Sequence, residues 1–241
     1  MILDFYKKVL PSKGVYCVAD IDPETKRTKH KFVESIDDLV TAIEDKKQYK
    51  TNVFVALSSF SGHSRRADDA QYVRSFFVDL DVGEGKGYAT KDDALAALDK
   101  FIDNAGLPPP VRVDSGGGVH AYWIFDEDVP AIEWKPYAEK FKQVCLDLGL
   151  HIDPVVTADL ARILRCPDTF NFKTEPPVPT KLLDSDMPVY VFNEFKTYLG
   201  PIEADPMSII QAIPKGMTEE QRRAAGLDNF ENSFQKIVDA T

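Results

Sequence analysis

The pattern of hydrophobic and polar positions predicts a chain that mixes strands and helices. Strands are indicated by short apolar or alternating runs, and helices by apolar residues spaced three to four apart behind polar caps. The predicted strands are residues 14–19, 31–34, 52–57, 75–82, 111–125 (two strands around a glycine turn) and 189–192. The predicted helices are residues 1–9, 35–47, 91–104, 132–148, 157–165 and 194–199. This order of elements indicates a mixed α/β (α+β) fold.

The strand at residues 75–82 is the most informative stretch, because it places two aspartates one residue apart. Side chains alternate along a strand, so Asp79 and Asp81 leave the same face, about 6–7 Å apart. Two such carboxylates can converge on divalent ions, whose charge offsets their mutual repulsion. The simpler alternative is an exposed strand end with two solvated aspartates. The turn that follows, residues 83–88, is rich in glycine but does not match a phosphate-binding P-loop.

A second stretch joins a serine, three glycines and a histidine. Residues 115–118 read Ser-Gly-Gly-Gly, and His120 lies just beyond them at the start of the next predicted strand. Glycines let backbone N–H groups approach a ligand closely, as in an anion-binding nest. The combination therefore suits a triphosphate. The alternative is a hairpin turn with a histidine that is satisfied within the fold.

A third stretch combines a carboxylate with arginines. Asp153 begins a turn at a strand end, and the helix predicted for residues 157–165 would place Arg162 and Arg165 on neighbouring positions of one face. Two arginines near a carboxylate site could form structural ion pairs. They could equally clamp phosphate oxygens, which a planar guanidinium binds well.

Two further polar segments offer groups for binding. Alternation over residues 170–173 points Asn171 and Lys173 together, opposite two phenylalanines. The polar loop before the aspartate strand carries Arg65 and Arg66, which could contact a nucleic-acid backbone or could simply be solvated.

Composition narrows the class of protein. The chain has 241 residues, 44% hydrophobic and 28% charged, which is ordinary for a globular domain. Its net charge of −10 argues against a protein that coats nucleic acid through bulk charge, although an enzyme with a local basic groove stays possible. The chain shows no signal-peptide pattern, no apolar run long enough to span a bilayer and only three scattered cysteines. These features predict a protein of the reducing cytoplasm that does not bind membranes.

Taken together, the three stretches resemble the archaeo-eukaryotic primase superfamily. The segments that carry the resemblance are Phe-Val-Asp-Leu-Asp at 77–81, Asp-Ser-Gly-Gly-Gly-Val-His-Ala-Tyr-Trp at 114–123, and Ile-Asp-Pro followed by Ala-Arg-Ile-Leu-Arg-Cys-Pro-Asp-Thr-Phe-Asn-Phe-Lys within 152–173. The order and spacing are most similar to the primase–polymerases (PrimPol) of phages and plasmids, over roughly residues 10–195. One departure is Asp168, where relatives more often carry glycine, and we expect it to alter the turn and to add a negative charge.

The resemblance implies roles for individual residues. Asp79, Asp81 and Asp153 would be the catalytic carboxylates and would hold two divalent ions, Mg²⁺ or Mn²⁺. The nucleotide-binding residues implied or suggested by these motifs are Ser115, Gly116, Gly117, His120, Arg162, Arg165, Asn171 and Lys173. Arg65 and Arg66 are weaker candidates for contacts with DNA.

The resemblance also implies an activity and an architecture. The activity would be that of a DNA primase or DNA polymerase in phage or plasmid replication, a nucleotidyltransferase that uses a single-stranded DNA template and dNTP or NTP and releases pyrophosphate. An N-terminal α/β unit would pack on an RRM-like sheet, with the active site in the cleft between them. Residues 1–199 would form the catalytic domain, and residues 200–241 a linker and helical tail. A replicative helicase, or a helicase domain further along a longer chain, would be a partner, and the compartment would be the host cytoplasm if a phage encodes the protein.

Several alternatives stay open at the level of sequence. A non-catalytic RRM-like module would bind single-stranded nucleic acid without metal. A different two-metal enzyme, such as a nuclease or nucleotide cyclase, would use the same carboxylates, and an end-joining repair polymerase belongs to the same superfamily. The sequence does not distinguish ribonucleotides from deoxyribonucleotides, and three aromatic residues could select the sugar: Tyr88, Tyr122 and Phe172.

Overall fold

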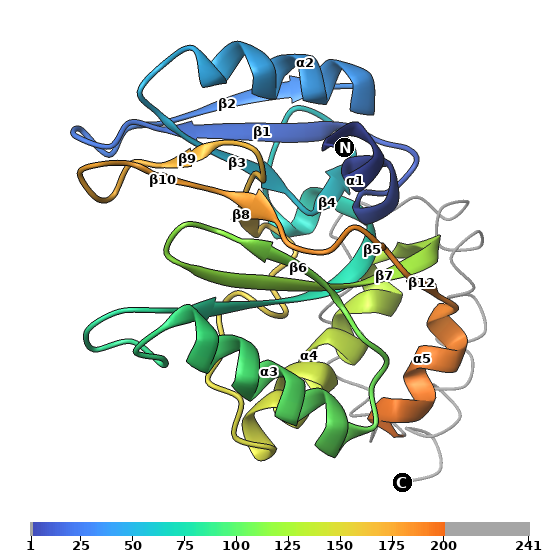
Figure 1. Ribbon diagram of the computed structural model, residues 1–241. Coiled ribbons are helices and arrows are strands. Elements are labelled where there is room, and N and C mark those ends of the chain that lie inside the picture. Colours follow the sequence, from blue (N-terminus) through green and yellow to red (C-terminus); the bar gives the residue numbers. More distant parts are fainter. Residues whose placement is uncertain (1, 201–241) are drawn as a thin grey trace, which may run out of the picture. The chain divides into compact units, whose positions relative to one another are not determined.

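The protein is built around two main sheets, mostly antiparallel, that lie one above the other, with helices on their outer sides (Figure 1). The structure, a computed structural model, describes residues 2–200. The linker and helical tail predicted for residues 200–241 lie, apart from Gly200, outside the described residues. Within residues 2–200, no helix is both long and apolar enough to cross a membrane.

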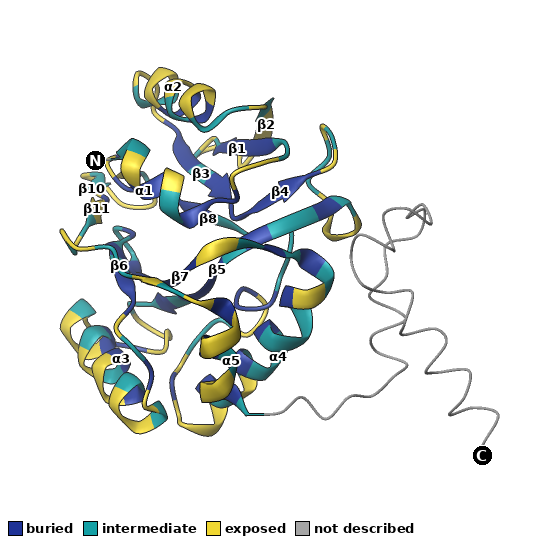
Figure 2. Ribbon diagram, turned by 90° about the vertical axis from the view of Figure 1, so that its right-hand side faces the viewer, coloured by how far each residue is buried: buried dark blue, intermediate teal, exposed yellow. Residues whose placement is uncertain are grey.

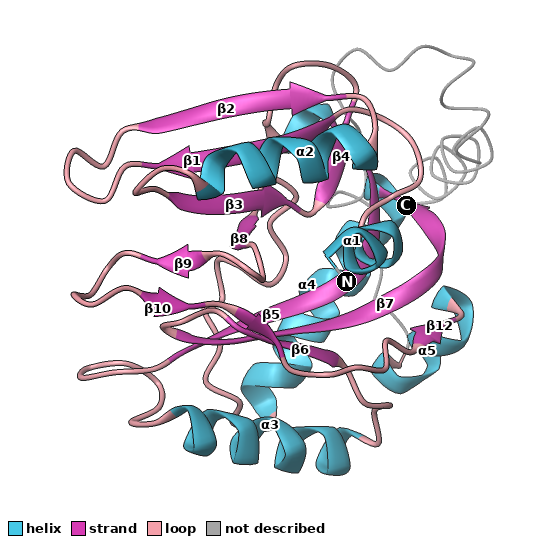
Figure 3. Cartoon of the chain, turned by 45° about the horizontal axis from the view of Figure 1, so that its top comes forward, coloured by secondary structure: helices cyan, strands magenta, loops and turns pink. Residues whose placement is uncertain are grey.

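The first sheet has four strands in the order β2-β1-β3-β8, all antiparallel. Its strands are β1 (Tyr16–Ile21), β2 (Thr28–Val33), β3 (Asn52–Ala56) and β8 (Ile163–Arg165). Helix α2 (Ile36–Lys47) covers one face, and α1 (Ile2–Val9) lies between the two sheets at one end (Figures 1 and 3). This arrangement agrees with the N-terminal α/β unit that the resemblance to primases implied.

The second sheet has the order β11-β6-β7-β5-β4, and β12 pairs in parallel with β7. Its strands are β4 (Ser58–Phe60), β5 (Ala70–Asp81), β6 (Val111–Asp114), β7 (Gly118–Pro130), β11 (Lys181–Leu182) and β12 (Val189–Tyr190). The other elements are the helices α3 (Lys91–Ala105), α4 (Ala131–Asp147) and α5 (Phe192–Leu199), the short 3₁₀ helix η1 (Ala67–Asp69) and the small hairpin of β9 (Phe170–Asn171) and β10 (Val178–Pro179). The succession β5-α3-β6-β7-α4 agrees with the predicted RRM-like sheet.

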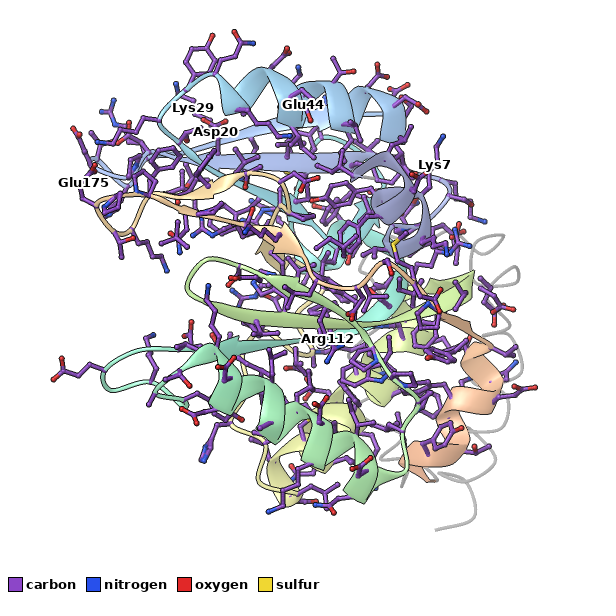
Figure 4. All side chains as sticks on the ribbon, viewed as in Figure 1. Lys7, Asp20, Lys29, Glu44, Arg112 and Glu175 are labelled. Atoms are coloured by element: carbon purple, nitrogen blue, oxygen red, sulfur yellow. The ribbon has the colours of Figure 1, made fainter. Side chains whose placement is uncertain are left out.

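Aromatic side chains fill the space between the second sheet and its helices. Phe76 of β5 stacks on Phe141 of α4, with ring centroids 5.1 Å apart, and Trp123 of β7 meets the same ring edge-on at 5.1 Å. The central strands β5 and β7 are buried along most of their length, whereas the helices expose their outer sides (Figure 2). On the rim of this sheet, Arg112 (labelled in Figure 4) pairs with Asp184 at 2.7 Å and so anchors the segment that follows β11.

Local sequence signals set the helix boundaries. The Ser35 hydroxyl accepts a hydrogen bond from the Asp38 N–H at the start of α2, and Thr90 and Asp93 form a reciprocal capping box at the start of α3. Gly106 ends α3 with a left-handed φ of 64°, which glycine adopts without strain. These helices therefore begin and end where the sequence predicted, within one or two residues.

The helix predicted for residues 157–165 is wrong. The segment makes turns instead, in which the Asp159 carboxylate accepts the Ala161 N–H at 2.8 Å, and Ile163–Arg165 then joins β3 as strand β8. Aspartate side chains compete with helical hydrogen bonding in this way, and an available strand edge decided the outcome. Arg162 and Arg165 consequently do not share a helix face.

Asp168 shows how the chain accommodates the residue that departs from the primase pattern. Its φ is 59°, in the left-handed region that glycine adopts most easily and that aspartate tolerates better than most residues. Asp168 thus adopts the conformation that a glycine would adopt here, so the expected change in turn geometry is not seen.

Candidate active site

The predicted carboxylates lie at the C-terminal end of β5, at the end of the second sheet where the β6–β7 turn and the loop at residues 83–88 also lie (Figure 1). Asp79 is paired across the sheet with His120, and Asp81 with Gly118. The Asp79 side chain keeps 22% of its surface exposed, and that of Asp81 keeps 45%. The prediction of a strand that carries both aspartates is therefore confirmed.

Asp153 is brought to the same place by a backbone hydrogen bond. Its N–H donates to the carbonyl oxygen of Asp79 at 3.2 Å, which fastens the loop after α4 to β5. The Asp153 carboxylate accepts the Val155 N–H at 3.0 Å and so holds the turn. Carboxylates from two segments that are far apart in the sequence, Asp79 with Asp81 and Asp153, thus gather at one end of the sheet.

The charges in this cluster act strongly on Asp79. Burial raises the pKa of the Asp79 carboxyl to about 7, and the negative charges of Asp81 and Asp153 contribute to the rise. The positive charges of Arg162 and Lys173 oppose it but do not cancel it. A carboxyl in this position favours either a proton or an additional cation beside it.

The donor set suits a hard divalent cation. Three carboxylates provide the oxygen ligands that Mg²⁺ and Mn²⁺ prefer. Burial first, and the charges of Asp81 and Asp153 second, raise the pKa of Asp79, so a cation bound beside it would favour its ionised form. Within the described residues, no three His, Cys, Asp or Glu side chains already lie close enough together to hold an ion. The chemistry of the site therefore fits a metal, and the metal itself stays a prediction.

His120 is a buried, neutral neighbour of Asp79. Its Nε2 lies 3.7 Å from an Asp79 carboxylate oxygen, and its Nδ1 lies 3.3 Å from the Tyr122 hydroxyl. Burial, aided by the positive charge of Arg165, lowers the pKa of His120 to about 3. His120 would therefore meet a phosphate as a neutral hydrogen-bonding group rather than as a cation.

The glycine loop is a tight hairpin turn whose own groups use much of its hydrogen-bonding capacity. The Ser115 N–H donates to the Gly118 carbonyl at 3.0 Å, and the Gly116 N–H donates to the Asp114 carboxylate at 2.8 Å. These two N–H groups are therefore not free to form an anion-binding nest. The binding roles predicted for Ser115, Gly116 and Gly117 stay predictions.

The glycines are needed because other atoms approach their backbone very closely. A Cβ on Gly118 would lie 2.2 Å from the carbonyl oxygen of Leu80, and one on Gly116 would lie 2.7 Å from the Asn171 Cβ. Asn171 is buried against this loop. The contact between Gly116 and Asn171 brings together two of the predicted binding segments, residues 115–118 and 170–173.

The two arginines play different parts. Arg162 acts on Asp79, and its Nε has no hydrogen-bond partner within the described chain, with the nearest Asp159 oxygen at 3.7 Å. Arg165 is buried, donates to the Asn52 side-chain oxygen at 2.5 Å and lies over the Phe54 ring at 4.6 Å. Burial lowers the pKa of Arg165 to about 10, so it stays charged at neutral pH. Arg162 thus keeps a buried Nε donor without a partner among the described residues, whereas Arg165 is largely committed to the fold.

Sequence reasoning missed one residue of the site, Lys86. Its ammonium group lies 3.0 Å from an Asp81 carboxylate oxygen, and this hydrogen bond raises the pKa of Lys86. The available signal was a lysine between two glycines immediately after an Asp-x-Asp strand. The turn does not match a phosphate-binding P-loop, and this mismatch says nothing about a lysine that reaches back to the carboxylates.

The remaining candidates are Arg65, Arg66 and the three aromatic residues considered for sugar selection. Arg65 donates to the Ala161 carbonyl and lies beside His30, and Arg66 is exposed. Among the three possible sugar-selecting residues, Tyr122 is buried, and the Tyr88 hydroxyl accepts the His151 N–H at 2.9 Å. Phe172 is the most exposed of the three.

Comparisons with known proteins agree with this architecture. No protein-family model matches the chain. A replication protein of Clostridium perfringens is 29% identical over 164 residues, which are 66% of this chain and 38% of that protein. The chain thus spans about two fifths of the length of this relative.

Solved structures resemble it more completely. The AEP domain of the cyanophage S-2L primase–polymerase has a TM-score of 0.56 at 15% identity, over 78% of this chain and 90% of that domain. Primase RepB′ has a TM-score of 0.55 at 14% identity, over 95% of this chain and 69% of that one. The RepB′ catalytic domain in complex with initiator DNA has a TM-score of 0.54 at 13% identity, over 90% and 99%. The chain therefore has the fold of the archaeo-eukaryotic primase catalytic domain, as the three sequence motifs predicted.

Proposed function

We propose that the protein is a template-directed nucleotidyltransferase, a DNA primase or DNA polymerase of a replication system. The observation that carries the proposal is the meeting of Asp79, Asp81 and Asp153 with the charges of Arg162 and Lys173 at one end of β5. Phosphoryl transfer needs mainly positioning and neutralisation of charge, which such a cluster can supply. The fold shared with primases and the similarity to a replication protein support the same conclusion.

The three aspartates would hold two divalent ions, Mg²⁺ or Mn²⁺. Ions bound there would promote attack by a 3′-hydroxyl group and would neutralise the triphosphate and the departing pyrophosphate. Asp153 would be kept in position by its backbone bond to Asp79, so that both carboxylates stay on the same side of the substrate.

The surrounding side chains would bind the incoming nucleotide. Arg162 and Lys173 would donate to phosphate oxygens, because the positive charges of both already act on Asp79. His120 would contribute a hydrogen bond without charge. Arg165 and Asn171 would mainly keep the site in shape, since both are buried and held by other residues.

A single-stranded DNA template would be the macromolecular partner. Primase RepB′, which shares this fold, is known in complex with initiator DNA. In this chain Arg66 is exposed next to Arg65, and the exposed His63 ring stacks on Phe32 at 5.5 Å, so cationic and aromatic groups adjoin the segment that leads to Arg162. Such groups suit a nucleic-acid strand. A replicative helicase would be a further partner within a replication system.

The test is a synthesis assay on single-stranded DNA with labelled nucleotides, with and without a primer, in Mg²⁺ or Mn²⁺. We expect product with the wild type, and a loss of more than about 100-fold in Asp79→Ala and Asp81→Ala. Asp92→Ala, an exposed aspartate on α3, is the matched control and should retain activity. Circular dichroism would show that all variants are folded.

The outcomes separate the alternatives. Product without a primer would identify a primase–polymerase, and extension only from a primer would identify a polymerase. DNA binding without synthesis, independent of metal, would contradict the proposal and favour a non-catalytic binding module. Substantial synthesis by Asp79→Ala would contradict the assignment of the carboxylates.

A further inference from the structure

Lys86 is carried over the carboxylates by a short loop with glycines on both sides. The loop leaves β5 after Asp81 and is closed by two hydrogen bonds, from the Gly83 N–H to the Tyr88 carbonyl at 2.9 Å and from the Lys86 N–H to the Gly83 carbonyl at 3.1 Å. Gly83 and Gly85 have φ values of 136° and 71°, which other residues rarely adopt. The backbone thus fixes the position of the Lys86 Cα, and the side chain reaches back to the Asp81 carboxylate.

The ammonium group of Lys86 lies where an added cation would be expected. It is 3.0 Å from Asp81 Oδ2, and the charges of Asp79 and Asp153 also act on it. Both partners are about half exposed, with 52% of the Lys86 side chain and 45% of the Asp81 side chain accessible. An exposed pair of this kind contributes little to stability and is easily exchanged.

A divalent ion on the carboxylates and the Lys86 ammonium group would compete for Asp81. Both are cations that need the same oxygen, and they repel each other at short distance. Lysine is suited to such an exchange, because its charge sits at the end of a flexible four-carbon stem. Once displaced, the ammonium group stays tethered beside the site, where a triphosphate would bring negative charge.

We propose that Lys86 holds Asp81 before divalent ions bind and then moves to the phosphates of the bound nucleotide. The proposal rests on the proposed function, since it assumes that metal and nucleotide bind at this site. It adds a positioning role for a residue outside the three primase-like motifs. It also predicts that loss of the Lys86 charge strengthens binding of the divalent ion and weakens binding of the nucleotide.

The experiment compares wild type with Lys86→Gln and Lys86→Arg by calorimetry. The first titration uses Mn²⁺ alone, without nucleotide. We expect Lys86→Gln to bind Mn²⁺ about two- to fivefold more tightly than the wild type, because a modest competing ion pair is gone. The second titration adds a non-hydrolysable nucleoside triphosphate at saturating Mn²⁺, where Lys86→Gln should bind more weakly and Lys86→Arg should resemble the wild type.

Lys47→Gln is the matched control. Lys47 pairs with Glu44 at 2.6 Å on α2, the helix of the first sheet. This variant therefore loses the same charge and a similar ion pair, but on a helix of the other sheet. It should leave both affinities unchanged.

The results distinguish this proposal from the proposed function. Unchanged or weaker Mn²⁺ binding by Lys86→Gln, together with loss of Mn²⁺ binding in Asp79→Ala, would overturn the role of Lys86 and leave the metal site standing. Tighter Mn²⁺ binding with unchanged nucleotide binding would overturn the second half of the role. Absence of Mn²⁺ binding in the wild type would overturn both proposals.

Discussion

The strand pair β5–β7 performs two opposite tasks along one ladder. In its middle, Phe76 is paired with Trp123, and both rings pack on Phe141 in a region that excludes water. Only a few residues further on, Asp79 is paired with His120, and the same ladder carries a group of charges that repel one another. The backbone pairing is continuous, so the side chains alone make the difference.

The comparison shows how a fold can carry an unfavourable site. The free energy gained by burying the aromatic half offsets the cost of holding a carboxyl among other carboxylates. The ladder also fixes the positions of Asp79 and His120, which flexible loops would not do as well. Changes in the middle of the ladder should therefore alter stability, whereas changes at its end should alter ligand binding and pH dependence.

The largest change in stability should come from Phe76→Ala. Removing the ring leaves a cavity against Phe141 and should lower the free energy of unfolding by about 3–5 kcal/mol. Urea unfolding measures this. Tyr49→Ala, at a side chain that is 64% exposed, is the control and should change the free energy by less than about 0.5 kcal/mol. Similar decreases in the free energy of unfolding of the two variants would contradict the interpretation that the aromatic middle of the β5–β7 ladder stabilises the fold.

Gly118→Ala should disrupt the pairing of β5 with β7 at the charged end of the ladder. The added methyl group would lie 2.2 Å from the Leu80 carbonyl oxygen, and backbone on both strands would have to move. We expect a loss of about 3 kcal/mol in urea unfolding, from overpacking in a region that cannot yield. Gly62→Ala has no atom within 4 Å of the new methyl group and should have little effect. A stable Gly118→Ala protein would show that the strands can separate at the site.

The pH dependence of stability should distinguish the charged end. The pKa of Asp79 is about 7 in the folded protein, against about 3.9 in an unfolded chain. Between these values the folded state holds more protons at Asp79, so the contribution of Asp79 to the free energy of unfolding of the metal-free protein falls as the pH rises from about 4 to about 7 and levels off above that.

Asp79→Asn removes this contribution. In the absence of metal, the variant should exceed the wild type by about 1–2 kcal/mol near pH 8, and the difference should shrink toward pH 4. Urea unfolding in EDTA at several pH values measures it. A difference that is the same at every pH would show that Asp79 does not titrate in this range. For the same reason, Mn²⁺ binding by the wild type should weaken as the pH falls below about 7.

The smallest effect should come from Asp168→Gly. Glycine adopts the left-handed conformation of this turn without strain, but it also gives the unfolded chain more freedom. We expect a net change below about 1 kcal/mol, in the stabilising direction, measured as a small rise in Tm. A clear loss of stability would mean that the Asp168 carboxylate makes a contribution of its own.

Much of the architecture follows from the sequence alone. The caps at Ser35 and Thr90, the apolar spacing of the long helices and the alternation along β5 are local signals, so each predicts its element without knowledge of the rest. The three motifs also predicted which carboxylates would meet. The segment after Asp153 was not predictable in this way, because aspartate side chains and the edge of β3 compete for its backbone.

Other features depended on tertiary contacts that no local pattern encodes. The low pKa of His120 depends on its burial and on the charge of Arg165 from another sheet. The division of tasks between Arg162 and Arg165 depends on Asn52 and Phe54 from another strand. Lys86 became part of the site only because its loop turns back over Asp81. The sequence by itself determined which residues carry charge and where the capped helices α2 and α3 begin. The tertiary structure decided which charges face each other and which are removed from water, because electrostatic energies depend on distance and burial rather than on position along the chain.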